Sequence, residues 1–253
     1  MDSTLIISTL LSFILSFIFA MGGIGSAIAL VPALHSFVNL PLNMVKAIAL
    51  LTNTLSMSGA SISNLKSGRL HWRDGIVLII FSSLFAPAGA YASHFLNQKV
   101  LVIIYIIFLL LSVYMMLFKR TNAANSQQTH VLPSLYLAAV GTFAGILAGL
   151  LGIGGGSIIS PLLILKGYDP KKTVVLTASV IPFSAFTGFL AYAGMGHANT
   201  KYLIFCAGAG LLGGTLGTIV MHKWINSKNI KKLLSFILLL MAVKMIFQLV
   251  KYC

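Results

Sequence analysis

Long runs of residues without charge dominate this chain, and they set the elements that the sequence predicts. A membrane-spanning helix needs about 20 mainly apolar residues, so most of these runs predict transmembrane helices. The runs cover residues 3–45, 47–65, 75–98, 100–118, 121–165, 173–200, 202–222 and 233–243. We expect helical segments at 4–34, 42–64, 75–96, 99–118, 133–165, 172–194, 200–222 and 230–250. The predicted fold class is an all-α polytopic membrane protein.

The chain contains two similar halves. Gly23-Ile24-Gly25 recurs 129 residues later as Gly152-Ile153-Gly154. The same offset relates Pro32 to Pro161, Pro41 to Pro170, Val45 to Val174, Ala49 to Ala178 and Gly59 to Gly188, and an offset of 128 relates Gly68 to Gly196, Gly89 to Gly217 and His94 to His222. We therefore divide the chain into an N-terminal membrane repeat at 1–118, a polar linker at 119–132 and a C-terminal membrane repeat at 133–253.

Each half opens with an uncharged segment about twice as long as one crossing requires. Glycines lie near the middle of both segments, in 22–26 and 152–157. Glycine adopts backbone conformations that other residues avoid, and the prolines that follow, Pro32 and Pro161, further weaken a continuous helix. Each opening segment is therefore predicted to be broken by glycine and to turn back, either as a re-entrant hairpin or as a pair of crossings.

The basic residues distinguish two topologies. If each opening segment crossed the membrane once, the loops on the two faces would hold eight and nine basic residues, which gives no orientation. If each segment turns back, the second half is inverted and the distribution becomes twelve against five. The twelve are Lys66, Arg69, Arg73, Lys119, Arg120, Lys166, Lys171, Lys172, Lys223, Lys228, Lys231 and Lys232, and the five are Lys46, Lys99, Lys201, Lys244 and Lys251. The positive-inside rule favours this inverted repeat, with both termini outside.

Composition excludes several classes of protein. The chain is 58% hydrophobic and 8% charged, whereas about a quarter of an ordinary soluble domain is charged. Its formal net charge of +14 is scattered among short loops, and nucleic-acid binding needs a clustered basic patch. Its two cysteines, Cys206 and Cys253, make neither a disulfide framework nor a metal site.

Acidic residues are scarce, and this bears on the substrate. The three carboxylates, Asp2, Asp74 and Asp169, all lie outside the predicted hydrocarbon core. Cation transporters and proton pumps usually place acidic residues within their spans, so a cation substrate is disfavoured. The sequence also lacks paired carboxylates and the His-Glu-x-x-His, Walker and Ser-His-Asp groupings of enzymes. We expect neither catalysis nor a cofactor.

The glycine breaks are the first candidate site. A half-helix that begins after a break directs unpaired N–H groups and a partial positive charge at whatever lies before it. Two such starts predict an anion site with backbone donors at Gly25, Ser26, Gly154, Gly155, Gly156 and Ser157. Polar residues on the following helices would line it, namely Thr52, Asn53, Thr177 and Ser179. Alternatively, the glycines allow close helix packing and the polar side chains bond between helices.

At these residues the chain resembles the TauE/SafE family of membrane permeases, also called the sulfite exporter or toluene sulfonate uptake family. The resemblance rests on GIGGGSIISPLLIL at 152–165 and DPKKTVVLTASV at 169–180, and it extends over essentially the whole chain. A weaker copy, MGGIGSAIALVPAL, lies at 21–34, where Ser26 and Ala27 replace Gly155 and Gly156. The family implies transport of small sulfur-containing anions such as sulfite, sulfoacetate or organosulfonates across the plasma (inner) membrane of a bacterium or archaeon.

The sequence thus predicts a secondary transporter that moves a small oxyanion by alternating access. Its expected partners are a small anionic substrate and the lipid bilayer, without nucleic acid. A proton or sodium ion as coupling ion, and a homodimer, are left open. The rival interpretation is a non-transporting membrane scaffold, sensor or assembly factor built on the same fold.

Overall fold

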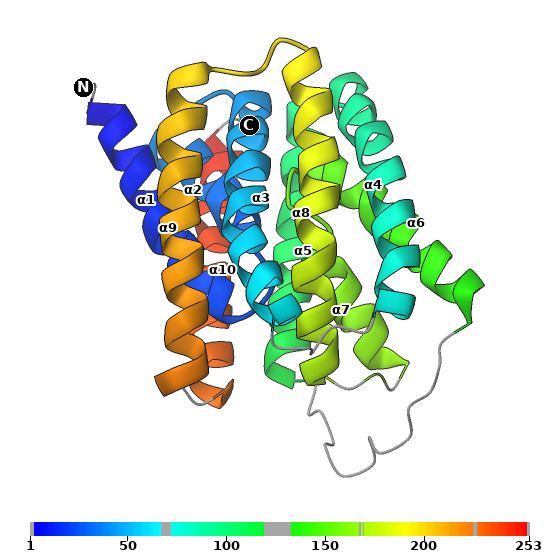
Figure 1. The fold of residues 1–253 in the computed structure, drawn as a ribbon. Helices are drawn as coiled ribbons and strands as arrows, with labels where there is room; N and C mark the ends of the chain where they lie inside the picture. The colour runs from blue at the N-terminus through cyan, green and yellow to red at the C-terminus, as the bar shows by residue number, and fades with distance from the viewer. Residues whose placement is uncertain are drawn as a thin grey trace.

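The computed structural model describes residues 3–66, 72–118, 133–166, 168, 170–224 and 227–251. All regular structure in these ranges is helical (Figure 1). The helices are α1 (Ser3–Met21), α2 (Ala27–Phe37), α3 (Leu42–Lys66), α4 (Trp72–Phe95), α5 (Gln98–Phe118), α6 (Ser134–Leu151), α7 (Gly156–Leu165), α8 (Pro170–Gly194), α9 (Thr200–Trp224) and α10 (Ser227–Lys251). The predicted all-α fold class is confirmed, and the predicted linker 119–132 lies outside the described residues.

Six of these helices are long and apolar enough to span a membrane. Their spanning portions are 3–21, 75–95, 98–115, 134–151, 172–194 and 200–220. Their outward faces carry exposed large apolar side chains, including Leu84, Ile107 and Leu212. So many exposed apolar side chains would be a liability in water but suit contact with lipid tails. The molecule is therefore a multi-pass membrane protein.

The glycine-rich segments break the helices in both halves. In the first half α1 ends at Met21 and α2 begins at Ala27, and in the second α6 ends at Leu151 and α7 begins at Gly156. At 11 and 10 residues, α2 and α7 are about 15 Å long, half the hydrocarbon thickness. The opening segments are thus a long helix followed by a returning half-helix, not a pair of complete crossings.

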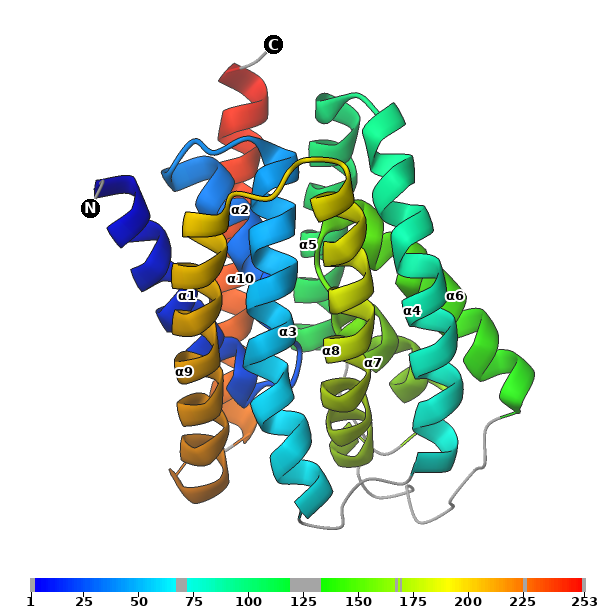
Figure 2. The ribbon, with the colours of Figure 1, turned by 45° about the horizontal axis from the view of Figure 1, so that its top comes forward.

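The long helices α3 and α8 lie side by side at the centre of the bundle (Figures 1 and 2). Each packs mainly against its partner and against one further long helix, α9 for α3 and α4 for α8, with smaller contacts to α1 and α6 respectively. Outside them, α1 packs on α9 and α6 packs on α4, and α5 packs on α10. The repeat pairs α1 with α6, α3 with α8, α4 with α9 and α5 with α10. If each helix is replaced by its counterpart, the same set of contacts results. Figure 1 also shows α3 and α8 running in opposite directions.

Glycines bring the paired helices into backbone contact. A methyl group added to Gly149 on α6 would overlap the Ala86 carbonyl of α4, and one added to Gly217 on α9 would overlap the Phe17 carbonyl of α1. Small residues at such positions let helices approach closely in membranes. The same glycines could not be replaced without separating the helices.

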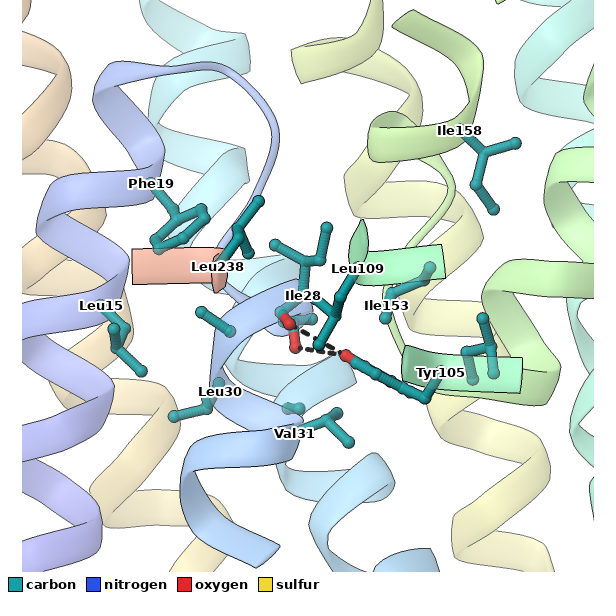
Figure 3. Packing of buried hydrophobic residues seen from close by; sticks show 14 of the residues in the cluster. Leu15, Phe19, Ile28, Leu30, Val31, Tyr105, Leu109, Ile153, Ile158 and Leu238 are labelled. Carbon is teal, nitrogen blue, oxygen red and sulfur yellow. Dashed lines mark hydrogen bonds between the residues drawn. The ribbon is translucent and has the colours of Figure 1, made fainter. Parts of the chain in front are cut away.

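The half-helix α2 is held by the core around it. Pro32 lacks an N–H group, so the carbonyl of Ile28 has no donor within the helix. The hydroxyl of buried Tyr105 on α5 supplies one, donating to the Ile28 carbonyl oxygen at 3.0 Å. Figure 3 shows this tyrosine reaching the start of α2 among packed apolar side chains, with α2 returning beside α1. The broken segment is therefore fixed on several sides.

Candidate functional site

The first break returns the chain alongside α1. Gly23 and Gly25 have φ values of 64° and 87°, in the left-handed region that favours glycine. The turn brings Ser26 beside Ser16 on α1, where the two hydroxyl oxygens lie 3.1 Å apart. The N–H of Ser26 donates to Oδ1 of Asn53 on α3, at 2.9 Å. The start of α2 thus points into the bundle at the middle of α3.

The second break has the same construction but more glycine. Gly152 caps α6 with a φ of 75°, and Gly154 and Gly155 follow at 70° and 48°. The equivalent of Gly155 in the first half is Ser26, whose φ of −74° is helical. The two turns therefore differ in backbone path at this position.

The two breaks meet at Asn53, which is completely buried. A Cβ atom added to Gly25 would overlap the Asn53 amide, and one added to Gly154 would lie 2.5 Å from Asn53 Nδ2. The breaks also approach each other directly, since a Cβ on Gly156 would lie 3.5 Å from the Ile24 carbonyl oxygen. Residues 129 positions apart in the repeat are thus brought together around one side chain.

The Asn53 amide is only half satisfied. Its Oδ1 accepts the Ser26 N–H, whereas Nδ2 has no hydrogen-bond partner among the described residues. Leaving a buried donor unpaired costs about 1–3 kcal/mol. An N–H group that faces two helix starts and lacks an acceptor is a suitable place for an oxyanion oxygen, because the helix N-termini favour negative charge there.

The other predicted lining residues have different surroundings. Thr177 Oγ1 donates to the Thr173 carbonyl at 2.9 Å and lies 3.4 Å from the Gly23 carbonyl, so it borders the first break. Ser157 and Thr52 are buried, and their hydroxyls have no hydrogen-bond partner in the part of the chain that the structure describes. Thr52, however, packs against Gly210 on α9. Ser179 bonds to the Val175 carbonyl of its own helix. No described contact links Thr52 or Ser179 to the breaks.

Several residues beside the breaks were not among the predicted site residues. Ser16 bonds to Ser26, and Ser184 Oγ would lie 3.2 Å from a Cβ on Gly155. Lys46, interpreted from sequence as a charge flanking a span, is buried against Gly152. The sequence held one indication that Lys46 is buried: it lies inside the predicted helix 42–64, not in the loop before it. Among the described residues, no group of three or more His, Cys, Asp or Glu side chains could hold a metal ion.

Comparison with known proteins gives a consistent result. A probable membrane transporter protein of Bacillus subtilis, YunE, is 26% identical over 250 residues, which cover 89% of this chain and 91% of the relative. A probable membrane transporter protein of Methanocaldococcus jannaschii is 28% identical over 145 residues, 56% of this chain and 52% of the relative. Sulfite exporter TauE/SafE family protein 6 of Arabidopsis thaliana is 32% identical over 103 residues, 41% of this chain and 24% of the relative.

No solved structure matches the chain. The family model described as sulfite exporter TauE/SafE matches residues 8–245, which include both glycine breaks and all the helices that surround them. Together with the multi-pass helical fold, this match shows that the chain belongs to the sulfite exporter TauE/SafE family of membrane transporters.

Proposed function

We propose that this protein moves a small sulfur-containing oxyanion, such as sulfite, sulfoacetate or an organosulfonate, across the membrane. The observation that carries the proposal is Nδ2 of Asn53, which lies between the two glycine breaks and has no hydrogen-bond partner among the described residues. An oxyanion oxygen bound there would satisfy the donor while facing the N-termini of α2 and α7. The family description, which names sulfite, supports the class of anion.

The charge distribution supports the sign of the substrate. The chain has only three carboxylates, and none lies on α1–α3 or α5–α7. Neutral donors and helix N-termini can bind an anion without a buried ion pair. The proposed backbone donors are the N–H groups of Gly25, Gly154, Gly155 and Ser157, with Asn53 and Thr177 as side-chain ligands. The N–H of Ser26 already donates to Asn53 Oδ1 and that of Gly156 to the Gly154 carbonyl. Thr52 and Ser179 are the weaker members of the predicted set.

Alternating access is the proposed mechanism. Substrate sites in inverted-repeat transporters lie near mid-membrane at the interface of the repeats, between discontinuous helices. The contacts that exchange between halves, and the opposite directions of α3 and α8 (Figure 1), support an inverted repeat here. Rocking of one half against the other would expose Asn53 to each side in turn. With twelve basic residues against five, we place both termini outside a bacterial or archaeal plasma (inner) membrane.

Flux measurements test this function. Purified protein in liposomes should take up radiolabelled sulfite or a sulfonate, and Asn53→Leu should abolish uptake because it removes the donor at nearly constant volume. The control is Asn97→Leu, the same substitution at an exposed asparagine, which should leave uptake intact. Flux of a cation without flux of any sulfur oxyanion would contradict the proposal. Absence of all flux would favour the scaffold, sensor or assembly factor.

A further inference from the structure

A second buried polar group lies on α3, apart from the glycine breaks. Lys46 is 1% exposed, and its Nζ has no hydrogen-bond partner among the described residues. It precedes Asn53 by seven residues on the same helix, which corresponds to about 10 Å along the axis. Its stem packs on the second break, since a Cβ on Gly152 would lie 2.7 Å from Lys46 Cγ. The lysine therefore lies between one end of the bundle and Asn53.

The surroundings of Lys46 contain aromatic and polar groups but no described carboxylate. Its Nζ lies 5.6 Å from the centroid of the Tyr192 ring. The Tyr192 hydroxyl already donates to the Gly149 carbonyl at 2.9 Å and lies 2.7 Å from the hydroxyl oxygen of Ser93. Along the chain, Asp74 belongs to the start of α4 and Asp169 precedes α8, and both helices begin at the opposite end of the bundle (Figure 1).

The nearby helix ends do not supply a full counter-charge. Lys46 lies in the second turn of α3, where the helix dipole disfavours a cation. The C-terminus of α6 is favourable, but Tyr192 occupies the carbonyls of Gly149 and Leu150 there. An ionisable residue within a membrane span is costly to bury and marks a functional position. A buried charge without a partner is destabilising, as when one member of a buried ion pair is removed. A bound anion would supply the counter-charge that the described groups around Lys46 Nζ do not.

The groups around the connection between α8 and α9 are basic or neutral, so they do not repel an anion. His197, in the connection between α8 and α9, lies 3.5 Å from Asn43 Nδ2 through its Nε2, and its ring centroid is 6.5 Å from that of Tyr192. Burial lowers the pKa of His197, and repulsion from His94 and Lys46 lowers it further. The side chains named around this connection, Lys46 on α3, His94 on α4 and Tyr192 on α8, are thus basic or neutral.

We propose that Lys46 is the cationic ligand of a second anion position, located between the α8–α9 end of the bundle and the neutral donors at Asn53. The proposal rests on the proposed transport of an oxyanion and assigns a charged group to one side of its path. The repeat counterpart of Lys46 is Val175, so the opposite side of the path lacks an equivalent charge. An anion would therefore bind more tightly from the α8–α9 end than from the other end.

Two variants and a matched control test this assignment. Lys46→Met removes the charge at similar length, Lys46→Arg keeps it, and Lys99→Met removes an exposed lysine at the same end of the bundle. The readout is the half-saturating sulfite concentration for thermal stabilisation of the purified protein. Lys46→Met should raise it about tenfold or more, the effect of one charged hydrogen bond. Lys46→Arg should stay within about threefold, and Lys99→Met should match the wild type.

A second measurement uses the wild-type protein and does not depend on the variants folding. Acetic anhydride, which is similar in size to the substrate, should acetylate Lys46, and sulfite should protect it while leaving Lys99 reactive. Equal labelling with and without sulfite, or no labelling of Lys46 in either case, would overturn the proposal, as would a Lys46→Met protein with wild-type half-saturation. A wild type that neither binds nor transports any oxyanion would instead reject the proposed function itself.

Discussion

Replacing Gly154 by alanine tests whether the contact between the second break and Asn53 matters. Gly154 has a φ of 70°, and the left-handed region costs an L-residue about 1–2 kcal/mol. The new Cβ would also lie 2.5 Å from Asn53 Nδ2, about 1 Å closer than an ordinary contact. Forcing that overlap adds about 1–3 kcal/mol. We expect Gly154→Ala to lower the free energy of unfolding by about 2–5 kcal/mol.

The chain provides a control that separates backbone strain from overlap. Gly196 has a φ of 78°, and an added Cβ there would meet nothing within 4 Å. Gly196→Ala should therefore lose only the backbone share, about 1–2 kcal/mol. Denaturant unfolding in detergent micelles gives both values, and sulfite uptake into liposomes gives the functional result.

The functional consequence follows from the displaced amide. Moving Nδ2 by about 1 Å removes a hydrogen bond to a charged ligand, which corresponds to an increase of roughly tenfold to a hundredfold in half-saturating sulfite. Gly196→Ala should transport like the wild type. Equal losses of stability in the two variants, or an unchanged half-saturation in Gly154→Ala, would refute the reasoning.

Three further predictions concern the scaffold. Tyr105→Phe removes the donor to the Ile28 carbonyl and should cost about 1–3 kcal/mol in denaturant unfolding; no loss would show that another group satisfies this carbonyl. Gly149→Ala should prevent close packing of α4 on α6 and abolish the folded fraction seen by size exclusion, whereas Gly208→Ala, with open space around it, should not. Because the pKa of His197 is lowered on folding, its contribution to stability is present above about pH 6.5 and is lost as the pH falls through the lowered value. The melting temperature should therefore fall less on acidification in His197→Gln than in the wild type, and identical pH profiles would contradict this.

The fold class and the two breaks could be predicted because they depend on local properties of the chain. Run length and hydropathy determine which segments enter the membrane, and the positions that required glycine are those where φ is positive, such as Gly25 and Gly154. Two of the predicted spanning segments, α3 and α10, are not among the six apolar spans. In α10 only Ser235–Phe247 forms an apolar helix, whereas α3 is long enough to cross but carries many hydroxyls and amides. Its polar residues, including Asn53, are what make it a candidate for lining a site.

Which side chains meet was decided by the tertiary structure. Thr52 and Asn53 are neighbours in sequence, yet successive helix positions point about 100° apart, so one packs on α9 and the other lies between the breaks. The sequence also placed Lys46 among the charges that flank spans, whereas packing of α3 against the second break buries it. Backbone breaks follow from the stereochemistry of a residue itself. The partners of a side chain depend on the rotation and depth of each helix, which packing between distant segments determines.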